Sequence, residues 1–190
     1  MGSITAGLLE LRAPQSPSKV LKEIGVLGQK SFAKALPALR AIAERPVSEV
    51  EPDRTLLRTV ADKLRSTPEA SQGYWPTVLQ FAHFATSALN PDAPPPGPPW
   101  YAVDRGRGNT FQGSFEKRAF LLGGSTIFKN SVFVKCRIVL EANATVRLEN
   151  VTFIDCVFDF PPNGESVPAI QEIAKSLLAS GFNKASLPPG

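Results

Sequence analysis

The feature that most constrains the fold of this chain is a repeat of twenty residues in its second half. Residues 128–140 and residues 148–160 align without a gap when the first segment is shifted by twenty positions. The matched positions hold large apolar side chains, asparagines and cysteines, which is the composition of a scaffold rather than of a reactive site. The clearest pairs are Asn130 with Asn150, Phe133 with Phe153, Cys136 with Cys156 and Ile138 with Phe158.

Within each copy, apolar residues recur every five positions. Phe128, Phe133 and Ile138 follow this spacing, and a small residue lies two positions before each of them. Over about residues 120–160 the pattern resembles the pentapeptide-repeat family; no family is recognised for the N-terminal half. The resemblance implies a right-handed parallel β-helix with four faces and a coil of twenty residues. Asn143 departs from the pattern, because it stands where a large inward residue is expected, so residues 141–145 are interpreted as a turn or bulged corner.

A repeat of this kind makes physical sense only when its coils stack. One coil cannot bury its apolar side alone, whereas coils about 4.8 Å apart share backbone hydrogen bonds and place like residues on like. Phe133 should then lie on Phe153 inside the stack, and Asn130 on Asn150 at a corner, where asparagine tolerates left-handed backbone geometry. The two ends of the stack need covers, because they expose apolar surface and strand edges.

The N-terminal half has helical periodicity. Asp53 is placed to cap a helix with Leu57, Val60 and Leu64 on one face, and residues 76–89 are apolar around most of the helix. Ser16-Pro17 begins an earlier helix, and Pro37 either kinks the helical stretch that contains it or starts a second helix.

These patterns predict an α+β protein. An α-helical region (residues 1–90) is followed by a proline-rich connector (91–99), a short right-handed parallel β-helix of two to three coils (100–162), and a capping helix with a frayed tail (163–190). The capping helix should run from Pro168 to Ser180, with residues 183–190 as the tail. We expect this helix to cover one end of the stack, and the N-terminal helices to cover the other end or one flank. The connector is interpreted as a spacer, with a ligand for an SH3- or WW-like groove as the alternative.

The composition and charge of the chain argue against some classes of partner. A net charge of +4 in 190 residues does not demand nucleic acid or an anionic membrane. Residues 70–91 form the longest run without Asp, Glu, Lys or Arg, but polar residues and two prolines argue against a membrane span. We therefore expect no nucleic acid and no membrane span. Two cysteines and no secretory start favour a reduced cytoplasmic protein, and the Ala-, Pro- and Arg-rich composition favours a bacterial one.

No residue pattern points to catalytic, cofactor-binding or metal-binding residues. His83, the single histidine, is interpreted as a hydrogen-bonded packing residue, and Cys136 and Cys156 as buried thiols. Four basic residues at outward positions, together with two that lie nearby in the sequence, form a possible interaction surface for an acidic partner or nucleic acid. The four are Lys129, Lys135, Arg137 and Arg147, and the two are Arg105 and Arg107. Because acidic residues interleave with them, an ordinary solvated surface is the competing interpretation.

The function that follows is a non-catalytic protein-interaction or structural module, with another protein as the partner. The alternative is an enzyme or small-ligand binder with its site where the helical region meets the β-helix, near residues 100–107, for example a carbohydrate-acting β-helix enzyme.

Overall fold

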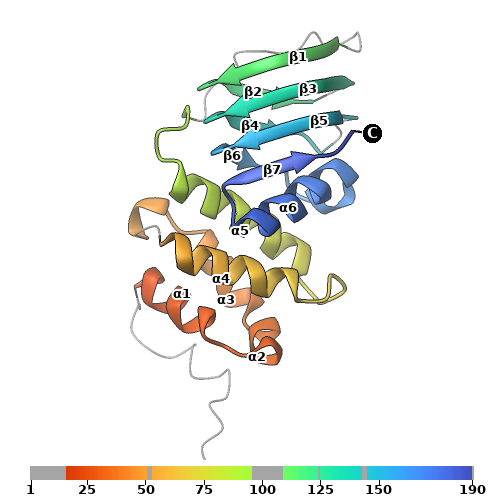
Figure 1. The fold of residues 1–190 in the computed structure, drawn as a ribbon. Helices are drawn as coiled ribbons and strands as arrows, with labels where there is room; N and C mark the ends of the chain where they lie inside the picture. Colours follow the sequence, from red (N-terminus) through yellow and green to blue (C-terminus); the bar gives the residue numbers. More distant parts are fainter. Residues whose placement is uncertain (1–15, 51–52, 96–108, 124, 143–144, 190) are drawn as a thin grey trace, which may run out of the picture.

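The computed structural model describes residues 16–50, 53–95, 109–123, 125–142 and 145–189, and it has a helical region beside a region of stacked strands (Figure 1). Five helices make up the described N-terminal region: α1 (Pro17–Gly25), α2 (Gln29–Lys34), α3 (Leu36–Ala43), α4 (Arg54–Arg65) and α5 (Tyr74–Leu89). A short 3₁₀ helix, Val47–Glu49, connects α3 toward α4. The α+β class is confirmed.

Local sequence signals account for the helix boundaries. The Asp53 carboxylate accepts hydrogen bonds from the amides of Thr55 (2.9 Å) and Leu56 (3.1 Å), which confirms it as the cap of α4. Pro37 lies in the first turn of α3, where its missing N–H costs no hydrogen bond, so the stretch around it is two helices and not one kinked helix.

Seven strands in the described residues form two sheets. The first sheet has the order β1 (Asn109–Glu116), β3 (Thr126–Val134), β5 (Arg147–Ile154), β7 (Lys184–Leu187). The second has the order β2 (Ala119–Leu122), β4 (Arg137–Leu140), β6 (Val157–Asp159). Neighbouring strands are parallel except β7, which is antiparallel to β5. The chain therefore alternates between the two sheets and forms three stacked rungs, which are β1 with β2, β3 with β4, and β5 with β6.

The register of the rungs follows the twenty-residue repeat. Phe133 pairs with Phe153 and Ile138 with Phe158, and the rings of Phe115, Phe133 and Phe153 stack at centroid distances of 5.0 Å. Asn130 and Asn150 both have positive φ, and Nδ2 of the Asn150 side chain donates to Oδ1 of Asn130 at 2.7 Å. The predicted stacking and asparagine corner are confirmed. The predicted corner at Asn143 lies outside the described residues.

The covers of the stack differ from the expectation. The helix α6 (Pro168–Ser180) has the predicted bounds, but the predicted tail is wrong, because Lys184–Leu187 forms β7 and completes the first sheet. Furthermore, α5 lies against β6 at the same end of the stack as α6 and β7, rather than at the opposite end (Figure 1). We call this the β5–β6 end. At the other, β1–β2 end, the described residues contain no further strand.

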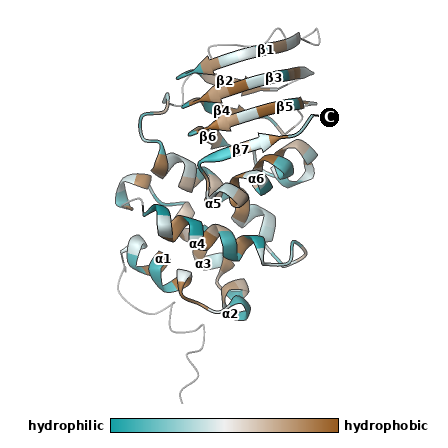
Figure 2. Cartoon of the chain, in the orientation of Figure 1, coloured by the Kyte–Doolittle hydropathy of each residue, from teal (hydrophilic) through white to brown (hydrophobic). Residues whose placement is uncertain are grey.

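The two regions share one apolar core. A single cluster of buried side chains runs from Leu21 and Leu57 in the helices through Phe81 of α5 to Phe153 and Phe158 in the strands. Phe182, which follows α6, packs edge-on against Phe81 at 5.6 Å. Apolar residues accordingly occur both along the strands and on the helices beneath them (Figure 2).

Candidate functional site at the junction of α5 and β6

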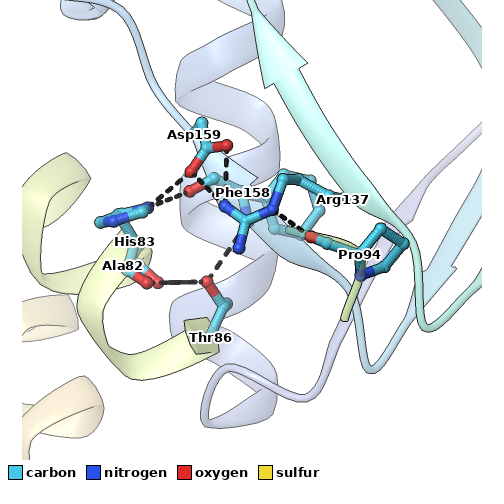
Figure 3. Close-up of polar contacts among 7 residues, drawn as sticks. All are labelled: Ala82, His83, Thr86, Pro94, Arg137, Phe158 and Asp159. Atoms are coloured by element: carbon cyan, nitrogen blue, oxygen red, sulfur yellow. Dashed lines mark hydrogen bonds and ion pairs between the residues drawn. The ribbon is translucent and has the colours of Figure 1, made fainter. Parts of the chain in front are cut away.

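A polar cluster connects α5 to the last rung of the stack. His83 projects from the middle of α5, and its Nδ1 lies 2.8 Å from the carbonyl oxygen of Phe158 and 3.0 Å from Oδ1 of Asp159 (Figure 3). Both neighbours are acceptors, so Nδ1 carries the proton and Nε2 is the free nitrogen of the neutral ring. The side chain of His83 is 42% exposed, which leaves part of the ring in contact with solvent.

Arg137 of β4 completes the cluster. Its Nη1 donates to both carboxylate oxygens of Asp159, each at 2.9 Å, and its Nε donates to the carbonyl of Pro94 (Figure 3). Only 12% of the Arg137 side chain is exposed. Arg137 thus lies in the junction and not on the outward surface where we had placed it, because the carboxylate of the next rung and the chain after α5 enclose it.

The cluster also satisfies the backbone of an edge strand. β6 is the last strand of the second sheet, and among the described residues no strand pairs with its outer N–H and C=O groups. The amide of Phe158 donates to Oγ1 of Thr86 (3.4 Å), and the carbonyl of Phe158 accepts from His83. Two side chains of α5 therefore replace a neighbouring strand, which avoids the cost of burying unpaired backbone groups.

The charges of the cluster reinforce one another. The hydrogen bond to Asp159 raises the pKa of His83 above its ordinary value, against the opposing effect of partial burial. Burial opposes ionisation of Asp159, but the hydrogen bonds from His83 and Arg137 outweigh it and hold the pKa of that carboxyl below its usual value. Asp159 is thus a carboxylate shared by two donors on different elements.

Two kinds of role are chemically open to this cluster. A histidine whose Nδ1–H is held by a carboxylate can act as a base through Nε2. The same geometry also suits a purely structural connection between α5 and β6, because Arg137 already neutralises the carboxylate of Asp159.

Within the described residues no group of three or more His, Cys, Asp or Glu side chains could hold a metal ion. A hollow of about 360 Å³ lies elsewhere, between α1 and α4, where Asp53 is engaged as the helix cap.

The remaining members of the expected basic surface have different surroundings. Lys129 forms an ion pair with Glu149 at 2.9 Å, and Arg147 contacts the same carboxylate at 3.1 Å. The hydrogen bond from Lys129 lowers the pKa of Glu149. Lys135 is exposed at a corner with positive φ. Arg105 and Arg107 lie outside the described residues. The structure therefore groups Lys129 with Arg147 and separates both from Arg137.

The two cysteines are free, buried and stacked on adjacent rungs. The amide of Cys136 lies 3.4 Å from Sγ of Cys156, as the twenty-residue register requires. The hydrogen bond with Cys136, together with burial, raises the pKa of the Cys156 thiol. A thiol held protonated in this way is a poor nucleophile and a suitable packing group.

The contacts of Asp159 with Arg137 and with His83 were not predicted from the sequence. The repeat places Arg137 on Val157, so the outward residue Asp159 stands diagonally across on the next rung, within reach of a long side chain. The diagonal pairing of Arg137 with Asp159 could therefore have been predicted from the sequence. The position of His83 could not, because it depends on how α5 lies against β6.

Searches against protein-family models, curated protein sequences and solved structures found no match for this chain. Among the described residues, none of the helices has the length and apolar character needed to cross a membrane.

Proposed function

We propose that the chain is a non-catalytic protein-interaction or structural module of a bacterial cytoplasmic protein, and that its strand region is a short right-handed parallel β-helix of the pentapeptide-repeat type. The twenty-residue register and the left-handed corners at Asn130 and Asn150 support the β-helix proposal. The free, buried cysteines agree with a reducing compartment. The proposed partner is another protein.

One observation carries this proposal: the two ends of the stack are unlike. At the β5–β6 end, β7 pairs with β5, and His83 and Thr86 satisfy β6. At the β1–β2 end, β1 is an edge strand, and within the described residues no strand pairs with its outer side. Because stacked repeats need covered ends, a stack fastened at one end by its own helices is suited to receive a partner at the other.

The test is site-directed photo-crosslinking in bacterial cells. A photoreactive amino acid is introduced at Gln112 on β1 and at Lys135 on the stack corner, with exposed Arg40 on α3 as the matched control. We expect polypeptide adducts from Gln112 or Lys135 and none from Arg40. Absence of a polypeptide adduct at both stack positions would reject the interaction module.

The alternative, an enzyme or small-ligand site at the junction, is supported by the His83–Asp159 contact of 3.0 Å and the partial exposure of the imidazole. Residues 100–107, where the sequence placed that site, lie outside the described part of the chain. This function predicts hydrolysis of an oligosaccharide panel that is lost in His83→Gln while the chain remains folded. Equal turnover, or none, in both proteins would reject it.

A further inference from the structure

The backbone hydrogen bonds of β1 show which of its N–H and C=O groups point away from the rest of the first sheet. The amide of Lys117 donates to the carbonyl of Val134 on β3 at 3.0 Å. In a parallel ladder the N–H and C=O of one residue point to the same side, and successive residues alternate. Ser114 and Glu116 therefore direct their backbone groups away from β3, and both are exposed. Within the described residues no strand pairs with this side of β1.

The opposite edge of the same sheet shows what kind of segment covers it. There β7 runs antiparallel to β5, with Ala185 opposite Phe153 and Leu187 opposite Val151. Ala185 and Leu187 are buried, whereas the alternate residues Lys184 and Ser186 are exposed. An extended segment with apolar residues at alternate positions thus completes this sheet.

The β1 edge has matching apolar surface. Phe111 stacks on Phe128 at 5.1 Å and Phe115 stacks on Phe133 at 5.0 Å. Phe128 and Phe133 are 1% and 0% exposed, but Phe111 and Phe115 are only partly buried. Both aromatic columns therefore end at β1 with apolar area that one more strand would cover.

Charge indicates which segment fits. The strand β1 is followed by Lys117 and Arg118, and Lys135 lies one rung below Lys117. All three are exposed. Among the described residues the one ion pair of this basic corner is the exposed contact of Lys117 with Glu116, 4.0 Å long. An acidic residue of an added strand would neutralise the corner, most usefully near its own first residue if the strand is antiparallel.

We propose that β1 is a strand-addition site for an extended segment of another protein, in which an acidic residue precedes alternating apolar residues, the segment adding antiparallel to β1 as β7 adds to β5. This inference rests on the proposed function and names its partner class.

A second copy of this chain fits the β1 edge less well. Pairing β1 with itself about Gly113 would bring uncharged Asn109 and Thr110 beside Lys117 and add no carboxylate there beyond that of Glu116.

The test begins with amide hydrogen exchange on the full chain. We expect the amides of Ser114 and Glu116 to exchange fast and those of Phe115 and Lys117 slowly, at every protein concentration. Protection of Ser114 and Glu116 that is independent of concentration would mean that the chain covers its own edge, for example with residues 96–108. Protection that grows with concentration would mean pairing of two copies. Either result overturns the proposal.

The second step selects random twelve-residue peptides displayed on phage against the full chain. We expect selected peptides to carry an Asp or Glu before alternating apolar residues and to protect the amides of Ser114 and Glu116. Ser114→Pro removes an outward N–H without breaking the β1–β3 ladder and should weaken binding about tenfold or more, the effect of one or two lost backbone hydrogen bonds. Ser114→Ala, which keeps the N–H, should bind as the parent does.

A second variant tests whether weaker binding reflects misfolding of the chain instead of the missing N–H. Glu116→Pro removes the other outward N–H, and both proline variants are compared with the parent by melting temperature. Lys117→Glu should weaken the acidic peptides about tenfold. Peptides without acidic residues, or equal binding by folded Ser114→Pro and the parent, would overturn the proposal. Crosslinks in cells at Lys135 but not at Gln112 would retain the interaction module and reject strand addition at β1.

Discussion

His83 and Thr86 connect a helix to a strand through the strand's own backbone. The carbonyl and amide of Phe158 would otherwise face a helix that has no backbone groups free to pair with them. Asp159 then adds a charge to the same contact, and Arg137 balances it. The stability of the junction should therefore contain a neutral part, set by hydrogen bonds, and a smaller part that depends on pH.

Two substitutions at position 83 separate these parts. Because the pKa of His83 is raised in the folded state, its ionic contribution is complete below the unfolded pKa, about 6.5, and is lost as pH rises through the folded pKa. His83→Asn retains a donor without the charge, so it should match the parent at pH 8.5 and be less stable at pH 5.5 by about 0.5–1 kcal/mol, a value limited by partial exposure. His83→Ala should lose a further ~1 kcal/mol at both pH values. Urea unfolding at the two pH values measures this; an equal loss for His83→Asn at both would contradict it.

The aromatic column tests the inward side of the strands. Phe153 is 1% exposed and stacks on Phe133, so Phe153→Asp buries an unpaired carboxylate. We expect a loss of several kcal/mol, enough to unfold a chain of ordinary stability. Thr152→Asp, at the neighbouring outward position, should change stability by less than about 1 kcal/mol. Thermal melts followed by circular dichroism distinguish them, and similar melts would place Phe153 at the surface.

At the scale of elements, β7 is a short strand with a large role, because it pairs the outer edge of β5 and packs on α6. Leu187 is 5% exposed, and Leu187→Ala should cost about 2 kcal/mol or more. Lys184→Ala, on the exposed side of the same strand, should cost less than about 0.5 kcal/mol. Urea unfolding gives both values, and equal losses would mean that β7 contributes nothing beyond its backbone.

The features of the fold that depend on the repeat or on local periodicity were predicted from the sequence. The stacking of Phe133 on Phe153, the asparagine corner, the cap at Asp53 and the bounds of α6 all follow from residues within one element or one repeat. The strand β7 was not predicted, because four residues flanked by loop signals carry little periodic information and their pairing is set by a distant edge. The burial of Arg137 was also not predicted. Alternation along a strand shows which side chains point outward, but it does not show which other elements pack against that outward face.

At the scale of the whole molecule, the continuous core makes the helices and the stack dependent on each other. The buried cluster passes from α4 through α5 and α6 into β5 and β6, so neither region has a separate interior. We expect one cooperative unfolding transition, in which helical circular dichroism and the protection of the β5 amides from hydrogen exchange are lost at the same urea concentration. Two separated transitions, or a stable fragment beginning at β1 after limited proteolysis, would contradict this coupling.

The closure of both sheets at the β5–β6 end has a consequence for how such a chain evolves. Apart from the hydrogen bond of Arg137 to Pro94, the contacts that end the stack involve its last rung, through Phe158, Val151 and Phe153. A tandem duplication of one twenty-residue unit between β4 and β5 would leave those contacts, and the β1 edge, with the same neighbours. Each duplication would lengthen the stack by about 4.8 Å and move β1 farther from the helices. The separation between its ends can therefore change in fixed steps by duplication alone, without new sequence at either end.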